Sequence, residues 1–160
     1  MLDEPLLPDY DGPCVCNVVP ALLEPPDELP SWLPPEAGAD QVVLLVLDGL
    51  GWEQLQARRS LAPNLHSMTG GPITTIAPST TSTALTSIST GMTPGEHGVI
   101  GYRMSIDAQV LNVLRWTVDS RDARDRIPPE KIQGHSAFLG HRPAVVTRAE
   151  FRTTGFTTAH

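Results

Sequence analysis

The stretch Val42-Val43-Leu44-Leu45-Val46-Leu47-Asp48 determines the fold class that the sequence predicts. Six consecutive apolar residues, all Val or Leu, are typical of a strand that is covered on both faces, as in a parallel sheet. Gly49 and Gly51 interrupt the apolar run, and residues 52–59 have the apolar spacing of a helix. The sequence therefore predicts a strand followed by a helix, which is the repeating unit of an α/β fold.

The alternation of strands and helices continues toward the C-terminus. We expect a short strand at 74–77, a helix from 81 or 82 to 90, a strand pair within 104–118, a helix start at Pro128 and a second parallel strand at 144–147. Such an order indicates a mostly parallel sheet with helices on both faces. No closing element is evident at residues 156–160, so we expect this architecture to be incomplete.

Residues 1–40 are expected to form a proline-rich N-terminal arm, because nine of the 16 prolines lie between Pro5 and Pro35. Proline at this density is incompatible with a regular helix or a central strand. The arm is therefore predicted to lie on the surface as extended chain. Its possible anchors are apolar: Val18, Val19, Leu22, Leu23, Trp32 and Leu33.

The charge of the chain excludes some partners. It has 11 basic and 18 acidic residues, for a formal net charge of −7 at pH 7. This sign disfavours binding to nucleic acids and to anionic membranes. The N-terminus has no basic and apolar signal region, and no apolar run approaches about 18 residues, so we expect a soluble, cytoplasmic protein. Cys14 and Cys16 are expected to be reduced thiols.

Asp48 and Thr81 are the candidate functional residues. Ligand sites in a parallel sheet lie beyond the carboxyl ends of the strands, so Asp48 could bind a divalent cation; it could equally cap a helix or order the turn at Gly49. Thr81 lies in the hydroxyl-rich run 79–83 at a helix start, where free backbone N–H groups can hold an anion. The same run can also be an ordinary helix cap. A threonine hydroxyl becomes a good nucleophile only when a base, a metal or a positive dipole stabilises its alkoxide.

Five segments, in their order and spacing, resemble the type I phosphodiesterase/nucleotide pyrophosphatase branch of the alkaline phosphatase superfamily. They are Val42–Leu50, Ala62–Leu65, Pro78–Thr81, Thr90–Pro94 and His97–Gly101. The resemblance extends over about Gln41 to Tyr102. It implies an alkaline-phosphatase-like three-layer sandwich, in which residues 41–160 are the N-terminal portion of the catalytic domain. It also implies a hydrolase that acts on small-molecule phosphodiesters or nucleotide pyrophosphates.

The resemblance assigns roles to single residues by position. Asp48 corresponds to the first metal-binding aspartate of the family, and Thr81 to the nucleophile that also ligates metal. The implied cofactors are two divalent metal ions, expected to be Zn²⁺, and the implied intermediate is a phospho-threonine. His97 matches a His-Gly element that is expected to shape a loop rather than to bind metal.

The sequence also departs from the family pattern. Ala84 stands where eukaryotic-type members have an Asn that stabilises the non-bridging oxygen. No Asp-His pair or close Asp-to-His spacing follows Thr81, which leaves two donors where a zinc site usually takes about four. The chain alone is therefore expected to be inactive.

A different class of function is a non-catalytic anion-binding or interaction module derived from the same fold, with the proline-rich arm in contact with a partner. Two other enzymes of the superfamily are disfavoured. A sulfatase needs a Cys/Ser-x-Pro-x-Arg element, which is absent, and phosphoglycerate or phosphopentose mutases usually have Ser at the position of Thr81.

Overall fold

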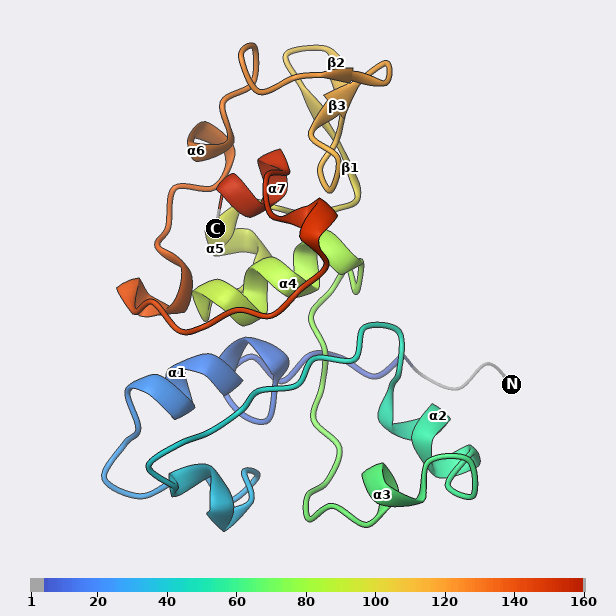
Figure 1. The fold of residues 1–160 in the computed structure, drawn as a ribbon, viewed down its shortest axis with the longest axis vertical. Helices are drawn as coiled ribbons and strands as arrows, with labels where there is room; N and C mark the ends of the chain where they lie inside the picture. The colour runs from blue at the N-terminus through green and yellow to red at the C-terminus, as the bar shows by residue number, and fades with distance from the viewer. Residues whose placement is uncertain (1–4, 160) are drawn as a thin grey trace.

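Helix α4 (Thr81–Thr90) lies at the centre of the molecule, between a sheet and the N-terminal part of the chain (Figure 1). The computed structural model describes residues 5–159. Thr80 precedes the helix in extended conformation, and Gly91 ends it with a φ of +73°, in the left-handed region that favours glycine. The predicted helix at 81–90 and its stop at Gly91 are confirmed.

Hydroxyl side chains form the fully buried face of α4. They are Ser82, Thr83, Thr86, Ser87, Ser89 and Thr90, whereas the apolar side chains of Ala84, Leu85 and Ile88 are only half-buried. Two of these hydroxyls bond to backbone carbonyls of the preceding helical turn. Thr86 Oγ1 donates to the Ser82 carbonyl at 2.8 Å, and Thr90 Oγ1 donates to the Thr86 carbonyl at 2.7 Å. Hydrogen bonds to the preceding turn allow a polar helix face to be buried without an unpaired donor.

The N-terminal segment contains a helix that the sequence did not predict. A 3₁₀ turn, η1 (Val15–Asn17), leads into α1 (Val18–Leu23), and both contact α4. The expectation that this segment holds no regular helix is wrong, because Pro20 lies in the first turn of α1, where a backbone N–H has no intrahelical acceptor to lose. Val19 is buried, and the other five proposed anchors are half-buried. A second 3₁₀ turn, η2, spans Pro35–Gly38.

Cys14 and Cys16 are buried in a small apolar cluster with Ile76, against which Tyr10, Val15 and Ala84 pack. Both are free thiols, as expected. Burial raises the pKa of the Cys16 thiol to about 12. Cys14 also forms an isolated parallel bridge with Thr74, so the strand predicted at 74–77 is reduced to one bridging residue.

The apolar run Val42–Leu47 is not a strand, and this corrects the prediction from which the fold class was argued. All six residues are exposed, with Val43 92 % and Leu45 65 % accessible to solvent. Within residues 5–159 the backbone of 42–46 makes no hydrogen bond, and a strand requires a neighbour that supplies them. Residues 144–147 are likewise not part of a strand and make no backbone hydrogen bond within residues 5–159, and Val146 is 99 % exposed. Neither segment therefore contributes to a parallel sheet.

The sheet that does form is antiparallel. Its four strands are β1 (Arg103–Ile106), β2 (Gln109–Asn112), β3 (Thr117–Val118) and β4 (Arg121–Asp122), in that spatial order. The α/β class is confirmed and the strand pair expected within 104–118 is present, but a mostly parallel sheet was the wrong prediction. The physical reason is the shortness of the connections. Asp107 and Ala108 join β1 to β2 with φ values of +47° and +60°, and such two-residue turns join only antiparallel strands.

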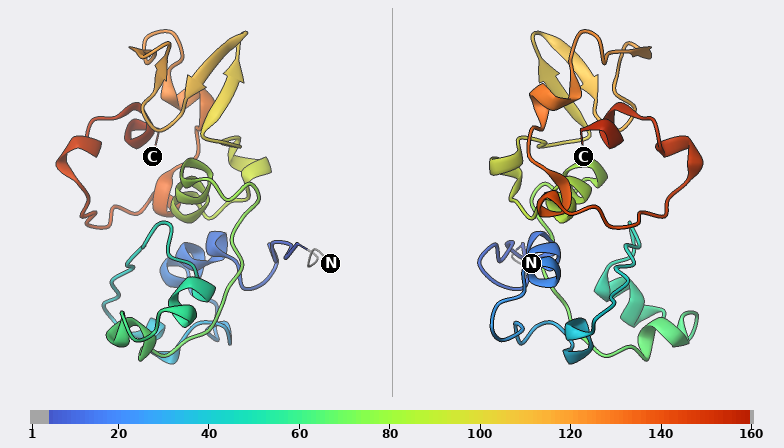
Figure 2. Two further views of the ribbon diagram at one scale, coloured as in Figure 1. Left: turned by 90° about the vertical axis from the view of Figure 1, so that its right-hand side faces the viewer. Right: turned by 60° about the vertical axis from the view of Figure 1, so that its left-hand side comes forward.

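The larger core lies on one face of this sheet. It consists of Val99, Leu111, Val113, Trp116, Val118, Ala123, Ile127 and Ala159. Trp116 is fully buried and donates its indole N–H to the Ile127 carbonyl at 2.7 Å. Residues near the C-terminus return to cover this face (Figure 2). There, buried Gln133 donates to the Ala159 carbonyl at 3.0 Å.

The remaining helices are short. They are α2 (Trp52–Ala57), α3 (Pro63–His66), α5 (Pro94–His97), α6 (Pro129–Ile132), η3 (Ala137–Gly140), η4 (Ala149–Phe151) and α7 (Gly155–Thr158). The helices predicted at 52–59 and from Pro128 correspond to α2 and α6. None of the helices in residues 5–159 is long and apolar enough to cross a membrane.

Candidate active site

The structure brings Asp48 and Thr81 together, although they are 33 residues apart in sequence. Thr81 Oγ1 donates a hydrogen bond to Asp48 Oδ2 at 3.0 Å. Asp48 is exposed and begins a turn at Gly49, whose φ of +80° is in the left-handed region. Thr81 is half-buried as the first residue of α4. The carboxylate therefore holds the hydroxyl of Thr81 at the start of the helix.

The first turn of α4 has free donors. The N-terminal Thr80 makes no capping bond with its side chain, because its hydroxyl pairs with the Thr83 hydroxyl at 3.0 Å instead. In the part of the chain that the structure describes, the backbone N–H groups of Thr81, Ser82 and Thr83 make no hydrogen bond. These groups and the positive end of the helix dipole are suited to an anion. The structure therefore does not show an ordinary side-chain cap at the start of α4, which was the alternative interpretation of residues 79–83.

Ser82 and Ala84 fix the first turn against the rest of the molecule. Ser82 is fully buried and donates through Oγ to the Gly101 carbonyl at 3.0 Å. Ala84 packs against the cluster around Cys14 and Cys16. Ala84, where the family resemblance led us to expect an oxyanion-stabilising Asn, therefore makes a core contact. The backbone N–H groups of the first turn are the donors that this part of α4 offers.

His97 has the structural role that its sequence context predicted. It is buried, accepts the Val99 N–H at Nδ1 at 3.1 Å, and lies 2.8 Å from Ser87 Oγ through Nε2. Because Nδ1 is an acceptor, the proton is on Nε2 and is donated to Ser87. The ring thus connects α4 to the loop after α5 and presents neither nitrogen to the candidate site.

A family model described as type I phosphodiesterase / nucleotide pyrophosphatase matches residues 42–160. The chain belongs to this family. No curated protein and no solved structure matches the chain. The resemblance deduced from residues 41–102 is confirmed, and the match extends it beyond Tyr102 to residue 160. At the level of the family, the function is that of a phosphodiesterase- or pyrophosphatase-type hydrolase.

The donor set for a metal in this phosphodiesterase-family chain is small. Within residues 5–159 no three or more His, Cys, Asp or Glu side chains form a group that could hold a metal ion. Asp48 and Thr81 bring two oxygen donors together. Oxygen donors suit a divalent cation, but two of them are fewer than the roughly four ligands of a zinc site.

Proposed function

We propose that this protein is a hydrolase of phosphodiester or nucleotide pyrophosphate bonds with Thr81 as its nucleophile. The observation that carries the proposal is the 3.0 Å hydrogen bond from Thr81 Oγ1 to Asp48 at the uncapped start of α4. Membership in the phosphodiesterase family supports the reaction class. The oriented hydroxyl and the free N–H groups are two parts that a phosphoryl transfer needs.

The residues divide the reaction between them. Asp48 accepts the proton as Thr81 Oγ attacks phosphorus, and the bond from phosphorus to the leaving-group oxygen breaks. The departing oxygen takes a proton from solvent, and a phospho-threonine remains. The N–H groups of the first turn of α4 hold the non-bridging oxygens, replacing the Asn that Ala84 does not supply. Water then attacks phosphorus and loses a proton to solvent, and the bond from phosphorus to Thr81 Oγ breaks. Oγ takes back the proton from Asp48, which restores the hydroxyl and releases a phosphomonoester, or phosphate from a terminal phosphoryl group.

Asp48 and Thr81 are also the residues that would hold a divalent cation, with Zn²⁺ as our proposal. Such a cation would lower the pKa of the attacking hydroxyl and neutralise charge that develops at phosphorus. Because the described residues bring only these two donors together, we infer that the 160-residue chain turns over substrate very slowly or not at all by itself. Further Asp and His donors, from a longer form of the chain, would complete the site.

The test is hydrolysis of bis-p-nitrophenyl phosphate in the presence of Zn²⁺ by the 160-residue chain and by a longer form of it. We expect turnover in the longer form and a loss on the order of 10³-fold or more in Thr81→Ala. Thr81→Ser is the matched control, because it retains a hydroxyl and should retain part of the rate. Turnover that survives Thr81→Ala in either form would refute the nucleophile assignment.

Zn²⁺ binding is a second readout that needs no turnover. Calorimetric titration should show weaker binding in Asp48→Asn than in the unmodified chain, since the substitution replaces an anionic donor by a neutral amide. If the longer form binds Zn²⁺ and an anion but never hydrolyses the diester, the protein is a binding module and the proposed catalysis is wrong.

A further inference from the structure

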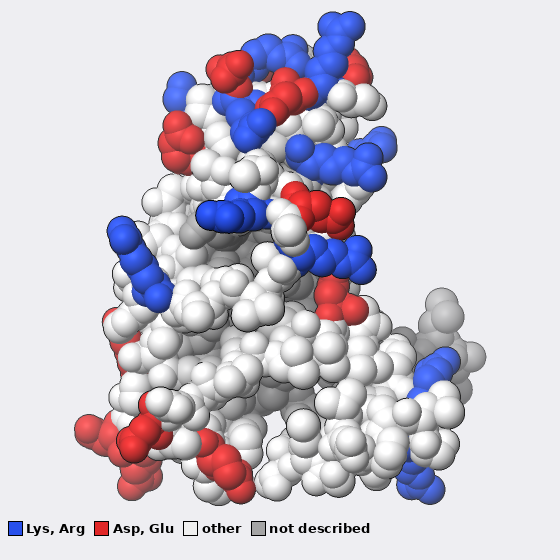
Figure 3. Space-filling view, in the orientation of Figure 1, with Lys and Arg blue, Asp and Glu red and all other residues white. Residues whose placement is uncertain are grey.

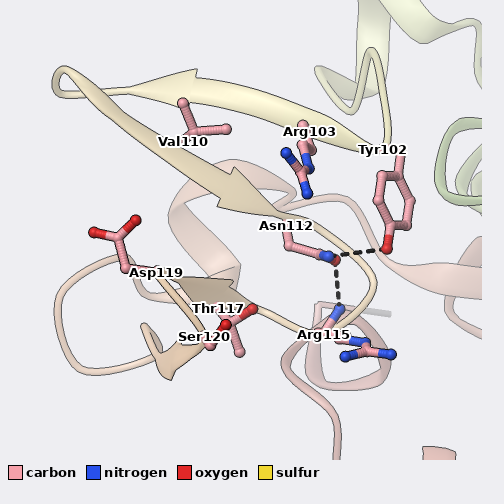
Figure 4. Close-up of a pocket in the computed structure, with 8 residues that line it drawn as sticks. All are labelled: Tyr102, Arg103, Val110, Asn112, Arg115, Thr117, Asp119 and Ser120. Atoms are coloured by element: carbon pink, nitrogen blue, oxygen red, sulfur yellow. Dashed lines mark hydrogen bonds between the residues drawn. The ribbon is translucent and has the colours of Figure 1, made fainter.

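A pocket lies on the face of the sheet that points away from the core. Met104, Leu111 and Val118 face the core, and the alternating positions Arg103, Asn112 and Thr117 are neighbours across the strands on the opposite face. Together with Tyr102, Arg115 and Asp119 they line a hollow of about 410 Å³ (Figure 4). This sheet pocket contains no candidate site residue from the sequence analysis, because its members come from three strands and from the turns beside them, with no shared motif.

One end of the sheet pocket is organised by hydrogen bonds. Asn112 donates through Nδ2 to the Tyr102 hydroxyl at 2.9 Å, and its Oδ1 accepts the backbone N–H of Arg115 at 3.1 Å. These two bonds fix the amide of Asn112 and the start of the loop that carries Arg115. The Tyr102 hydroxyl acts as an acceptor, so its own proton remains available to a ligand.

The guanidinium groups of Arg103 and Arg115 make no hydrogen bond or ion pair with any of residues 5–159. Elsewhere on the sheet Arg124 pairs with Asp122, and Arg126 donates to Gln109 at 3.3 Å. Each guanidinium has five N–H donors in a fork that matches phosphate or carboxylate oxygens. Two guanidinium groups at one pocket, with no hydrogen-bond partner among residues 5–159, therefore favour an anionic ligand.

The charge of the surrounding surface also favours an anion. Residues 101–160 contain nine of the 11 basic residues and six acidic ones, whereas residues 1–100 contain two basic and twelve acidic residues. Basic side chains gather over the sheet end of the molecule (Figure 3). The carboxylate in the pocket, Asp119, lies at the opposite end from Tyr102 and Arg115 (Figure 4). The arginine end thus stays positive within an acidic protein.

One hydrogen bond links helix α4, which begins at Thr81, to the residue that precedes the first residues of the pocket in sequence. Ser82, the residue after Thr81, is bonded to the Gly101 carbonyl, and Tyr102 and Arg103 follow directly in sequence. The start of α4 and the start of β1 are therefore held side by side (Figure 1). A substrate bound at Thr81 with a second anionic group would reach toward the arginine end of the pocket.

We propose that the sheet pocket binds a second phosphate group of the substrate, through Arg103, Arg115 and Tyr102. The substrate would then carry two or more phosphoryl groups, such as a nucleoside polyphosphate, rather than being a simple diester. This inference rests on the proposed function for the site of attack. The pocket itself takes no part in bond breaking, because it binds and orients the group that Thr81 does not attack.

The experiment is calorimetric titration of the 160-residue chain with inorganic pyrophosphate and with inorganic phosphate. We expect pyrophosphate to bind more tightly, and Arg103→Gln and Arg115→Gln each to weaken it about tenfold, the usual effect of losing one charge-assisted hydrogen bond. Arg121→Gln is the matched control, because it removes the same charge from β4 outside the pocket and should change the affinity less than about twofold.

Thr81→Ala separates this inference from the proposed function. It should abolish turnover in the longer form, whereas Arg103→Gln and Arg115→Gln should still each weaken pyrophosphate binding about tenfold when they are made in the Thr81→Ala background, since the pocket does not include Thr81. The inference is overturned if the unmodified chain does not bind pyrophosphate, if Arg121→Gln weakens binding as much as Arg115→Gln, or if Thr81→Ala abolishes binding.

Discussion

Replacing Gly155 by Ala is expected to lower the free energy of unfolding by about 3 kcal/mol. Gly155 is the buried first residue of α7 and lies directly against the indole of Trp116. A Cβ at this position would overlap Cβ and Cγ of Trp116 and lie 2.8 Å from its Cδ2. Carbon atoms in proteins normally approach to about 3.5–4.0 Å, so either α7 or the indole must move.

The magnitude follows from what that movement breaks. Overpacking a tight core costs about 1–3 kcal/mol, and loss of the 2.7 Å bond from Trp116 Nε1 to the Ile127 carbonyl adds about 1–3 kcal/mol if the donor stays buried. For a chain of this size, 3 kcal/mol corresponds to a fall in Tm of about 6–12 °C. In urea it lowers the midpoint by about 1.5 M, with an m-value of about 2 kcal/mol per M.

The matched control is Gly95→Ala. Gly95 lies in α5, and a Cβ there would meet no atom within 4 Å. This substitution should be neutral or stabilise the fold by up to about 1 kcal/mol, because Ala loses less backbone entropy than Gly on folding. Urea unfolding of both variants, followed by Trp fluorescence, decides the matter. Equal midpoints for Gly155→Ala and the unmodified chain would refute the packing described for Trp116.

Three further predictions concern other parts of the molecule. Because the pKa of Cys16 is raised to about 12, its alkylation in the native chain at pH about 8 should be on the order of 10³-fold slower than in the urea-unfolded chain; equal rates by mass spectrometry would contradict its burial. Thr93 and Glu96 form a capping box at the start of α5, in which the N–H and hydroxyl of Thr93 lower the pKa of Glu96 below its ordinary 4.5. The stabilisation from these bonds is therefore present above pH 4.5 and is lost as the pH falls through the folded pKa. Glu96→Gln should flatten this part of the pH dependence in thermal unfolding measured between pH about 3 and 6. Val43→Lys should change the free energy of unfolding, measured in urea, by no more than about 0.5 kcal/mol, because Val43 is 92 % exposed. A fall of several kcal/mol in the free energy of unfolding would show that this residue is buried in solution.

Local signals predicted α4 well. Its start among hydroxyl residues and its stop at Gly91 are set by backbone conformations that neighbouring residues dictate, so both could be deduced from sequence. The position of Thr81 as the first residue of the helix follows from the same signals. Its contact with Asp48 came from the family resemblance, because no local pattern relates residues 33 apart.

The prediction of a parallel sheet was wrong because it rested on apolar composition alone. The composition of Val42–Leu47 shows that the segment is suited to a covered strand, but pairing depends on a neighbouring strand, and within residues 5–159 the structure supplies none to it. The antiparallel sheet was harder to recognise, because its tight turns use Asp107-Ala108 and Asp119-Ser120 instead of the Asn-Gly or Asp-Gly pairs that usually mark them. Nothing in the sequence marked Arg103 and Arg115, since they come to line the same pocket only after these turns have formed.

The unequal division of charge between residues 1–100 and 101–160 gives the whole molecule an electric dipole, whose positive end is the sheet (Figure 3). A polyphosphate that diffuses toward the protein would be repelled by the acidic end and turned toward the sheet before any contact forms. Encounters would therefore be concentrated on one end despite the net charge of −7. The association rate would fall as added salt shortens the reach of this field, while dissociation would change much less.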